Sequence, residues 1–435
     1  MRDAIARFRI DTLGTPDAAV GWAATFYLGH VLFQGKIALS ELFAFGAIFC
    51  FGYAVARGRL KPTFHILYYP LLVYGIVSTV SALGADRRIH SAGEGMLWFK
   101  MAIFPVAVTL MRELPRMRRI ALRLQIVFAV AIAAWGLAEF IFADRRDLEH
   151  RITGPSPHVM TFSGLLLPLA LMLLLLWIHR RTWWLFAAMA TVNLVLLLTF
   201  TRSVWLGWGA AVLVLAMLTR APWRVFILPA ALWFLILMPL PLFGRLISTF
   251  DPSQSSNFDR IRMLEAGVEM IKDQPLLGVG PANVKEVYPL YKRHDAPRSR
   301  PPHLHNNVVQ LWAERGILGL AAYVMLMVLF LRECALAWKA HSQAPAVSGA
   351  GVGDQGPAPW ISGGAGDTSR VWAESGVAVC VSLAVAGLFE FNFGDTEVFY
   401  LMLDLFAVLV VTMESGRTQR QPTNEPPGVL VPAHA

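Results

Sequence analysis

Two histidines and two asparagines stand directly before a predicted helix, in the stretch HLHNNVVQLWAERG that begins at His303. An imidazole can accept a proton from a hydroxyl group near neutral pH, which the neighbouring side chains cannot easily do. His305 is therefore a candidate general base, and His303 and Asn306 are candidates for supporting the group that His305 deprotonates. The structural alternative is that His305 and Asn306 only cap the helix and hydrogen-bond the segment before it. We favour acid–base chemistry.

Metal binding through His303 and His305 is the weaker expectation. No carboxylate cluster lies close to them in sequence, and the chain contains no Asp-x-Asp, HExxH or cysteine-pair motif that would complete a site. Cys50, Cys334 and Cys380 lie far apart, which indicates neither a disulfide framework nor a zinc site. The sequence also lacks a GxxxxGK loop, so we expect no metal, no cofactor and no nucleotide.

Two arginines are candidates for binding an anion. Arg202, in LLLTFTRSVWLG, lies between two apolar segments, where a cation is costly unless it is paired or lines a wet cavity. The alternative for Arg202 is a side chain that snorkels to the membrane surface. Arg260 is predicted in the first turn of a helix capped by Asn257, where free N–H groups and the helix dipole favour a diphosphate. The alternative for Arg260 is a surface ion pair with Asp259 or Glu265.

Further basic residues surround these candidates on the same side of the predicted membrane domain. Arg262 follows on another face of the Arg260 helix and is expected to be exposed, and Lys100 is expected one or two turns inside an apolar segment. Together the basic residues describe an electropositive mouth suited to a phosphate-bearing lipid, and we add Arg88 and Lys100 to the expected diphosphate ligands. The loop arginines are Arg87, Arg88, Arg145, Arg146 and Arg151.

The elements that position these residues are membrane helices. Of the 435 residues, 56% are hydrophobic and 15% charged, and the mean hydropathy is +0.53, which predicts an all-α polytopic membrane protein. The net charge of +9 first suggests the positive-inside bias, and no soluble basic domain is present to bind nucleic acid. About twelve apolar segments are long enough to cross a bilayer: 18–34, 37–56, 63–83, 95–111, 120–143, 159–178, 183–200, 203–219, 223–243, 314–338, 371–389 and 397–413.

Short basic loops fix the expected orientation. The loops 57–61, 112–119, 179–182 and 220–224 fall on one side and are richer in Lys and Arg than the opposite short loops. Both termini are therefore predicted to be cytoplasmic, with the basic N-terminus kept as a tail. The candidate residues then face the opposite, outer side of the membrane.

The chain is expected to divide into four parts: membrane helices one to nine in 1–243, a periplasmic lid in 244–313, three further helices in 314–413, and a disordered cytoplasmic tail in 414–435. A flexible cytoplasmic loop, rich in Gly, Ala, Pro and Ser, is predicted at 341–369. In the lid, a helical repeat of Ile261, Leu264, Val268 and Ile271 predicts one buried stripe.

The order and spacing of these motifs resemble the O-antigen ligase/polymerase superfamily. The features that carry the resemblance are TRSVWLG at an outer helix junction, DRIRMLEAGVEMIKDQPLLGVG opening the large loop and HNNVVQLWAERGILGL closing it. The spacing of His305 and Gly316 is similar to the ligase pattern, and the resemblance covers about 60–410. One departure is Leu264, at a position where tryptophan is frequent in the family.

The resemblance implies a GT-C-like fold and a metal-independent, inverting glycosyl transfer on the periplasmic face of the bacterial inner membrane. The donor would be a glycan on undecaprenyl diphosphate, and the acceptor a sugar of the lipid A–core oligosaccharide, with membrane lipids as further partners. By the same resemblance, Arg202 and Arg260 would stabilise the leaving diphosphate, and His305 would deprotonate or orient the acceptor hydroxyl.

Two rival functions remain. An O-antigen polymerase uses the same donor chemistry with a lipid-linked glycan as acceptor, but it more often carries two large periplasmic loops, whereas one is visible here. A small-anion transporter would need a polar pathway through broken helices at mid-membrane, and the predicted membrane centres are nearly unbroken apolar runs. A purely structural scaffold would leave Arg202 unexplained. We therefore favour a ligase.

Overall fold

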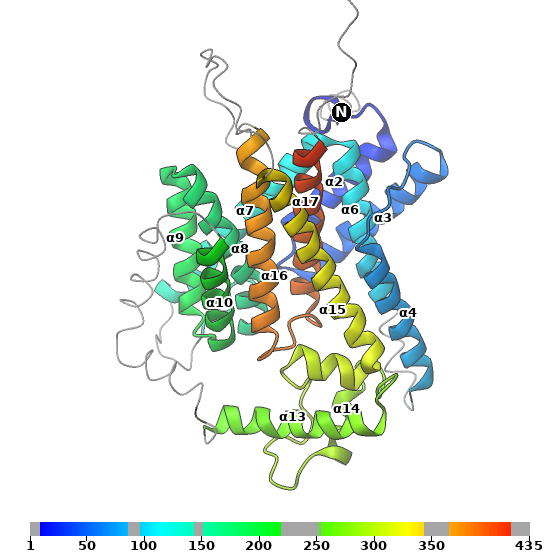
Figure 1. Cartoon of the computed structure of the whole chain (residues 1–435), viewed down its shortest axis with the longest axis vertical. Coiled ribbons are helices and arrows are strands. Elements are labelled where there is room, and N and C mark those ends of the chain that lie inside the picture. The colour runs from blue at the N-terminus through cyan, green and yellow to red at the C-terminus, as the bar shows by residue number, and fades with distance from the viewer. Residues whose placement is uncertain are drawn as a thin grey trace, which may run out of the picture.

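The computed structural model describes residues 9–85, 96–142, 151–218, 251, 254–342 and 365–418. In these ranges all regular structure is helical, which confirms the all-α prediction (Figure 1). The elements are η1 (Arg9–Leu13), α2 (Ala18–Leu32), α3 (Ile37–Ala56), α4 (Tyr68–Gly84), α6 (Met96–Glu113), α7 (Pro115–Phe142), α8 (Val159–Arg180), α9 (Trp183–Leu198), α10 (Arg202–Leu218), α13 (Ser255–Asp273), α14 (Val284–Tyr291), α15 (Asn307–Ser342), α16 (Ala365–Ala386) and α17 (Thr396–Thr418).

The helices have the length and composition of a helical membrane protein. Five described helices are long and apolar enough to cross a membrane, namely α3, α7, α8, α15 and α17, and α2, α4, α9 and α10 are shorter apolar helices. Every predicted apolar segment falls on a helix except 223–243, which lies outside the described residues. Both ends of the predicted loop 341–369 belong to helices, since α15 continues to Ser342 and α16 begins at Ala365.

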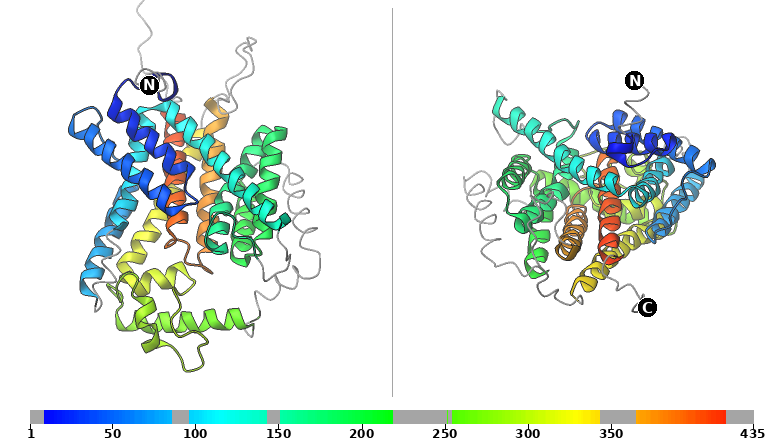
Figure 2. Two further views of the ribbon diagram at one scale, coloured as in Figure 1. Left: turned by 180° about the vertical axis from the view of Figure 1, so that it is seen from behind. Right: turned by 90° about the horizontal axis from the view of Figure 1, so that it is seen from above.

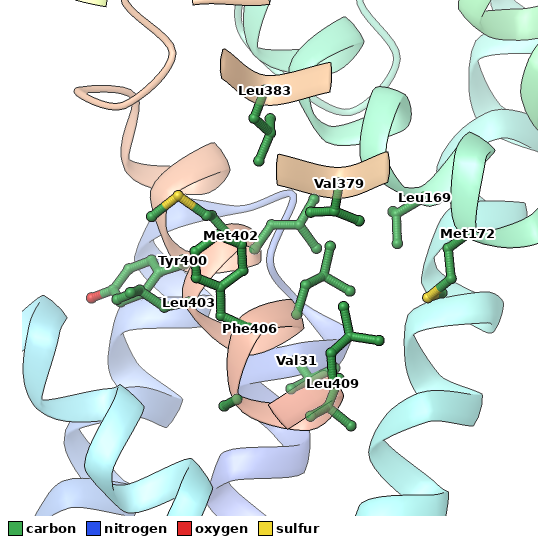
Figure 3. Packing of buried hydrophobic residues seen from close by; sticks show 14 of the residues in the cluster. Val31, Leu169, Met172, Val379, Leu383, Tyr400, Met402, Leu403, Phe406 and Leu409 are labelled. Carbon is green, nitrogen blue, oxygen red and sulfur yellow. The ribbon is translucent and has the colours of Figure 1, made fainter. Parts of the chain in front are cut away.

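Helix α17 lies at the centre of the bundle. It packs against α6, α7, α8, α15 and α16, and 89% of the residues in its most apolar stretch are buried. Because it is covered on all sides, its sequence is mostly apolar on every face. Asp404 is a buried exception, which accepts a hydrogen bond from the hydroxyl of Tyr27 (2.9 Å). Figure 3 shows part of the apolar packing, in which side chains of three helices gather: Leu403, Phe406 and Leu409 from α17, Leu169 and Met172 from α8, and Val379 and Leu383 from α16.

A second layer crosses one end of the bundle. It consists of α13, α14 and the first part of α15, and it faces the segment that joins α16 to α17 (Figures 1 and 2). This layer has a core of its own, in which side chains from all three helices pack together: Met263, Ala266, Met270, Val284, Tyr288, Leu304 and Ala313.

The predicted buried stripe of α13 is wrong at two of its four positions, whereas Leu264 and Ile271 are half-buried and Ile271 packs against the core of the second layer. Ile261 is 38% exposed and Val268 is 42% exposed. The buried face instead carries Met263, Ala266, Gly267 and Met270. Small residues and methionines occupy it because α13 approaches α15 closely: a Cβ added at Gly267 would lie 2.5 Å from Val309.

The two layers join at a sharp corner inside α15. Gly316 has φ 66° and ψ −175°, so the segment before it lies in the outer layer and the segment after it runs through the bundle. The PLLGVG stretch fills the corner, with the N–H of Val279 donating to the carbonyl of Ala313 (2.8 Å) and that of Ile317 donating to Pro275 (2.9 Å). A Cβ at Gly316 would lie 1.9 Å from the carbonyl oxygen of Leu276. Glycine is therefore the one residue type that fits this corner.

We expect Gly316→Ala to destabilise the fold by at least about 3 kcal/mol, because it adds a strained backbone conformation to a clash with backbone. The check is the thermal unfolding midpoint of the detergent-solubilised protein. Gly209→Ala is the matched control, since its added Cβ would have no neighbour within 4 Å and a helical alanine is neutral or stabilising. Equal midpoints for the two variants would contradict this account of the corner.

Candidate functional site

Three side chains meet at one carboxylate where the outer layer faces the bundle. Glu390 lies in the segment between α16 and α17, 8% exposed. His305 Nδ1 is 3.0 Å from Glu390 Oε2, and His303 Nε2 is 3.4 Å from Glu390 Oε1. Arg260 Nη2, from α13, is 4.0 Å from Glu390 Oε2. The structure thus brings three predicted site residues, His303, His305 and Arg260, together around Glu390, which the sequence analysis did not identify.

The asparagines of the HNN motif hold the Glu390 segment in place. The side-chain oxygen of Asn306 accepts from the N–H of Val309 (3.0 Å), which caps α15, and its amide nitrogen donates to the carbonyl of Leu388 (2.8 Å). Asn307 donates to the side chain of Asn392 (2.6 Å), and its backbone N–H donates to the carbonyl of Gly387 (2.6 Å). The capping role considered for Asn306 is therefore observed, and the same residue also anchors the segment that carries Glu390.

His305 adopts an uncommon backbone conformation. Its φ of 52° lies in the left-handed region, which non-glycine residues seldom occupy. In this conformation its N–H donates to His303 Nδ1 (3.3 Å), and the two rings lie 4.2 Å apart between centroids. Strained backbone of this kind persists where the surroundings hold it, and it is frequent at active sites.

The hydrogen bonds assign the protons on both rings. Burial lowers the pKa of His303 to about 4, so this ring is neutral near pH 7. Its Nδ1 accepts from the backbone of His305, which leaves the proton on Nε2, facing Glu390. A carboxylate can only accept, so His305 donates from Nδ1 to Glu390 and keeps a free lone pair on Nε2. In the neutral ring of His305, Nε2 is therefore the nitrogen with a lone pair available to accept a proton.

Glu390 carries a negative charge at neutral pH. Burial opposes its ionisation, but the hydrogen bond from His305 and the electrostatic attraction of the His305, His303 and Arg260 side chains outweigh burial, so the pKa of Glu390 is lowered. A lowered carboxyl pKa means that the ionised form is retained down to acidic pH. Burial also lowers the pKa of Arg260, an effect that the charge of Glu390 opposes.

Helix α13 begins earlier than predicted. Its N-cap is Gln254, so Asn257 lies in the first turn and Arg260 in the second. Arg202, the first residue of α10, donates to Gln254 Oε1 (2.7 Å), Ser256 Oγ (3.0 Å) and Asn257 Oδ1 (3.0 Å). Arg202 therefore contacts the start of α13, one turn before Arg260, and both guanidinium groups lie near a helix N-terminus that favours anions.

The neighbouring charges of α13 are arranged differently from the expectation. Arg262 was expected to be exposed, but its side chain is 16% exposed and pairs with Glu265 (2.8 Å) and Asp295 (2.5 Å). Asp259 pairs with Arg298 (2.8 Å), so it is not the partner of Arg260. The surface ion pair considered as an alternative for Arg260 is thus replaced by its approach to Glu390.

The remaining predicted site residues lie apart from Glu390 or outside the described chain. Lys100 Nζ donates to Thr396 Oγ1 (2.8 Å) and lines a cavity beside His303. Arg151 donates to the carbonyl of Thr199 (2.9 Å), at the turn before α10. The other predicted loop arginines, Arg87, Arg88, Arg145 and Arg146, lie outside the described residues.

His303, His305 and Glu390 are also a group that could hold a metal ion. One ligand atom from each residue lies within 4.8 Å of the others. The sequence did not predict this group because Glu390 is distant from the two histidines along the chain. The guanidinium of Arg260 lies 4.0 Å from the same carboxylate. The charge of Arg260 would repel a cation bound to this group.

Glu390 could have been noticed from a weak signal in the sequence. It stands in LFEFNFGDTE, a carboxylate flanked by aromatic residues between two predicted membrane helices. Ionisable groups at the edge of an apolar region are expensive and frequently functional. Without the fold, nothing in the sequence connects this glutamate to a histidine 85 residues earlier.

Comparison with known proteins supports the resemblance. The family model described as O-Antigen ligase matches residues 187–324. This range contains α10, α13, α14 and the first part of α15, and so includes Arg202, Arg260, His303, His305 and Asn306, but not Glu390. No curated protein matches the chain. Over residues 187–324 the chain is therefore similar to the O-antigen ligase family, which confirms the resemblance seen in its sequence.

Proposed function

We propose that this protein is an O-antigen ligase. It transfers a glycan from undecaprenyl diphosphate to a sugar hydroxyl of lipid A–core, without a metal and with inversion at the anomeric carbon. The site faces the periplasm in the inner membrane, and both termini are cytoplasmic. The fold is GT-C-like with about twelve membrane spans, a proposal supported by the nine apolar helices α2, α3, α4, α7, α8, α9, α10, α15 and α17 in the described chain and by the apolar segment 223–243.

One observation carries the proposal: a single buried carboxylate contacts both a proton acceptor and a guanidinium. Glu390 orients His305 through Nδ1 and lies 4.0 Å from Arg260. A glycosyl transfer from a diphosphate needs these two functions side by side. The acceptor hydroxyl must lose a proton, and the leaving diphosphate must be stabilised as negative charge builds on it.

The proposed reaction follows from this arrangement. The acceptor oxygen attacks the anomeric carbon as its proton passes to His305 Nε2. The bond from that carbon to the diphosphate oxygen breaks, and its electron pair stays on the diphosphate, beside Arg260 and Arg202. Glu390 stabilises the imidazolium that forms on His305, and this proton is later released to solvent.

The test is transfer in vitro. Purified protein in detergent receives an undecaprenyl-diphosphate-linked glycan and lipid A–core, and products are separated by size and by lipid. Glycan on lipid A–core is the expected product. Lengthened donor chains in place of this product would identify a polymerase, and a well-folded protein that forms neither would contradict glycosyl transfer.

Removal of divalent metal is expected to change the transfer rate by less than about twofold, because no Lewis acid takes part in the proposed step. The rate would be measured in excess EDTA and again after addition of Mg²⁺, Mn²⁺ or Zn²⁺. Loss of activity in EDTA and its recovery with one metal would show instead that His303, His305 and Glu390 hold an ion.

A further inference from the structure

A cavity of about 260 Å³ adjoins the histidine pair on the side of His303. Its walls come from α4, α6, the first part of α15 and the segment 391–399. His303 lines it, whereas Arg202, Arg260 and His305 do not. His303, which lines the cavity, faces Glu390 Oε1, whereas Arg260, which does not line the cavity, lies nearest to Glu390 Oε2.

Aromatic rings form one wall of this cavity. Tyr74, Phe393 and Phe399 pack edge to face, with centroids 5.4 Å apart for Tyr74–Phe393 and 5.1 Å for Phe393–Phe399. Phe391 is partly exposed, and its ring lies 6.1 Å from the ring of His303. Pyranose rings carry apolar C–H faces, and flat aromatic surfaces bind such faces while polar groups at the rim bind the hydroxyls.

The described lining of the cavity carries one ion pair and one further lysine. Arg315 pairs with Glu314, donates to Ser78 Oγ (2.9 Å) and lies over the ring of Tyr74. Lys100 Nζ donates to the hydroxyl of Thr396 (2.8 Å). A diphosphate carries more than one negative charge, and beside the Arg315–Glu314 pair the described lining offers it the single cation Lys100. Uncharged hydroxyl groups fit the mixture of donors and acceptors.

We propose that this cavity binds an uncharged hexopyranose ring of the acceptor, with Phe391 under one face of the ring and Lys100 donating to a hydroxyl. The assignment to the acceptor rests on the proposed function. Attack with inversion requires the acceptor to approach the anomeric carbon from the side opposite to the leaving diphosphate, and Arg260 lies nearest to a different oxygen of Glu390 from the one that faces His303. Lys100 then serves the sugar, a role different from the diphosphate binding expected from charge alone.

Binding can be tested without any transfer reaction. The full-length protein is placed in a detergent without a sugar headgroup, and saturation-transfer difference NMR is recorded with methyl hexopyranosides, including those of glucose and galactose. Phe391→Leu and Lys100→Met are the test variants. Phe49→Leu, at a residue 77% exposed on α3, and Lys272→Met, at an exposed lysine of α13, are the matched controls.

The expected result is saturation of the C–H protons on one face of a pyranoside, with affinity lowered about tenfold in Phe391→Leu and unchanged in the controls, as loss of an aromatic contact predicts. Inorganic pyrophosphate should not displace the sugar. If Phe391→Leu does not fold, Gly394→Ala replaces it, because the added Cβ would lie 2.0 Å from the Phe391 ring and displace it. Unchanged sugar binding in the test variants, or displacement by pyrophosphate, would overturn the proposal.

The transfer assay then separates the acceptor from the donor. Phe391→Leu should raise KM for lipid A–core about tenfold and leave KM for the donor unchanged. A rise in KM for the donor alone would show that the cavity binds the donor sugar, and would overturn its assignment to the acceptor. Because sugar binding is measured separately, a protein that binds the pyranoside through Phe391 but transfers no glycan would contradict the proposed function and not the cavity.

Discussion

Replacing His305 by alanine is expected to lower kcat for glycan transfer by about 10²–10⁴-fold, the usual contribution of a positioned general base. His305 is the group whose Nε2 is left free to accept a proton, because Nδ1 donates to Glu390. Alanine removes the acceptor and leaves both substrates able to bind, so KM should change much less than kcat. The measurement is the initial rate of transfer to lipid A–core over a range of both substrates.

Two controls make the His305 result specific. His294→Ala removes an exposed imidazole from the same layer and should leave kcat unchanged. Glu390→Gln keeps the size of the side chain but removes its charge, so it should lower kcat less than His305→Ala does, because the base is still present but less well oriented. A folded His305→Ala variant that keeps parental kcat would contradict the role of base, and would leave His305 as a residue that only positions the acceptor.

The sequence contained most of the local information about this site. Arg202 was selected as a cation between two apolar segments, Arg260 by its place near a helix N-terminus, and His305 as an imidazole before a helix. The corner at Gly316 was visible only as a spacing from His305, and its reason is a backbone contact with Leu276 that belongs to the fold. Residue type and spacing thus selected the candidate residues but did not predict their geometry.

The rest depended on contacts between distant segments. Glu390 reaches His305 across 85 residues, and the asparagines that hold its segment bond to backbone groups at 387 and 388. The face of α13 was predicted wrongly because aliphatic residues were assumed to mark the buried side. Close helix contact at Gly267 instead selects small residues, while Ile261 and Val268 remain exposed. Periodicity reports which residues are apolar, not which face a neighbouring helix covers.

Arg260→Ala is expected to lower kcat by about 10²–10³-fold, which corresponds to about 2.7–4 kcal/mol of lost transition-state stabilisation. The guanidinium lies in the second turn of α13, where it can bind a diphosphate oxygen while remaining near Glu390. The negative charge of the diphosphate grows as the glycosidic bond breaks, so the loss should appear mainly in kcat and less in the donor KM. Arg293→Ala, which removes a half-exposed arginine of the same layer, should have little effect on either constant.

Arg260 could instead act only by compensating the charge of Glu390, and a double variant separates the two roles. If compensation were its whole contribution, removing both charges in Arg260→Gln with Glu390→Gln would restore the rate to that of Glu390→Gln alone. If the guanidinium stabilises the leaving diphosphate, the double variant should stay at least as slow as Arg260→Gln, because the leaving group loses its partner whether or not Glu390 is charged. The coupling between the two substitutions therefore measures how much of the effect of Arg260 is exerted on the substrate.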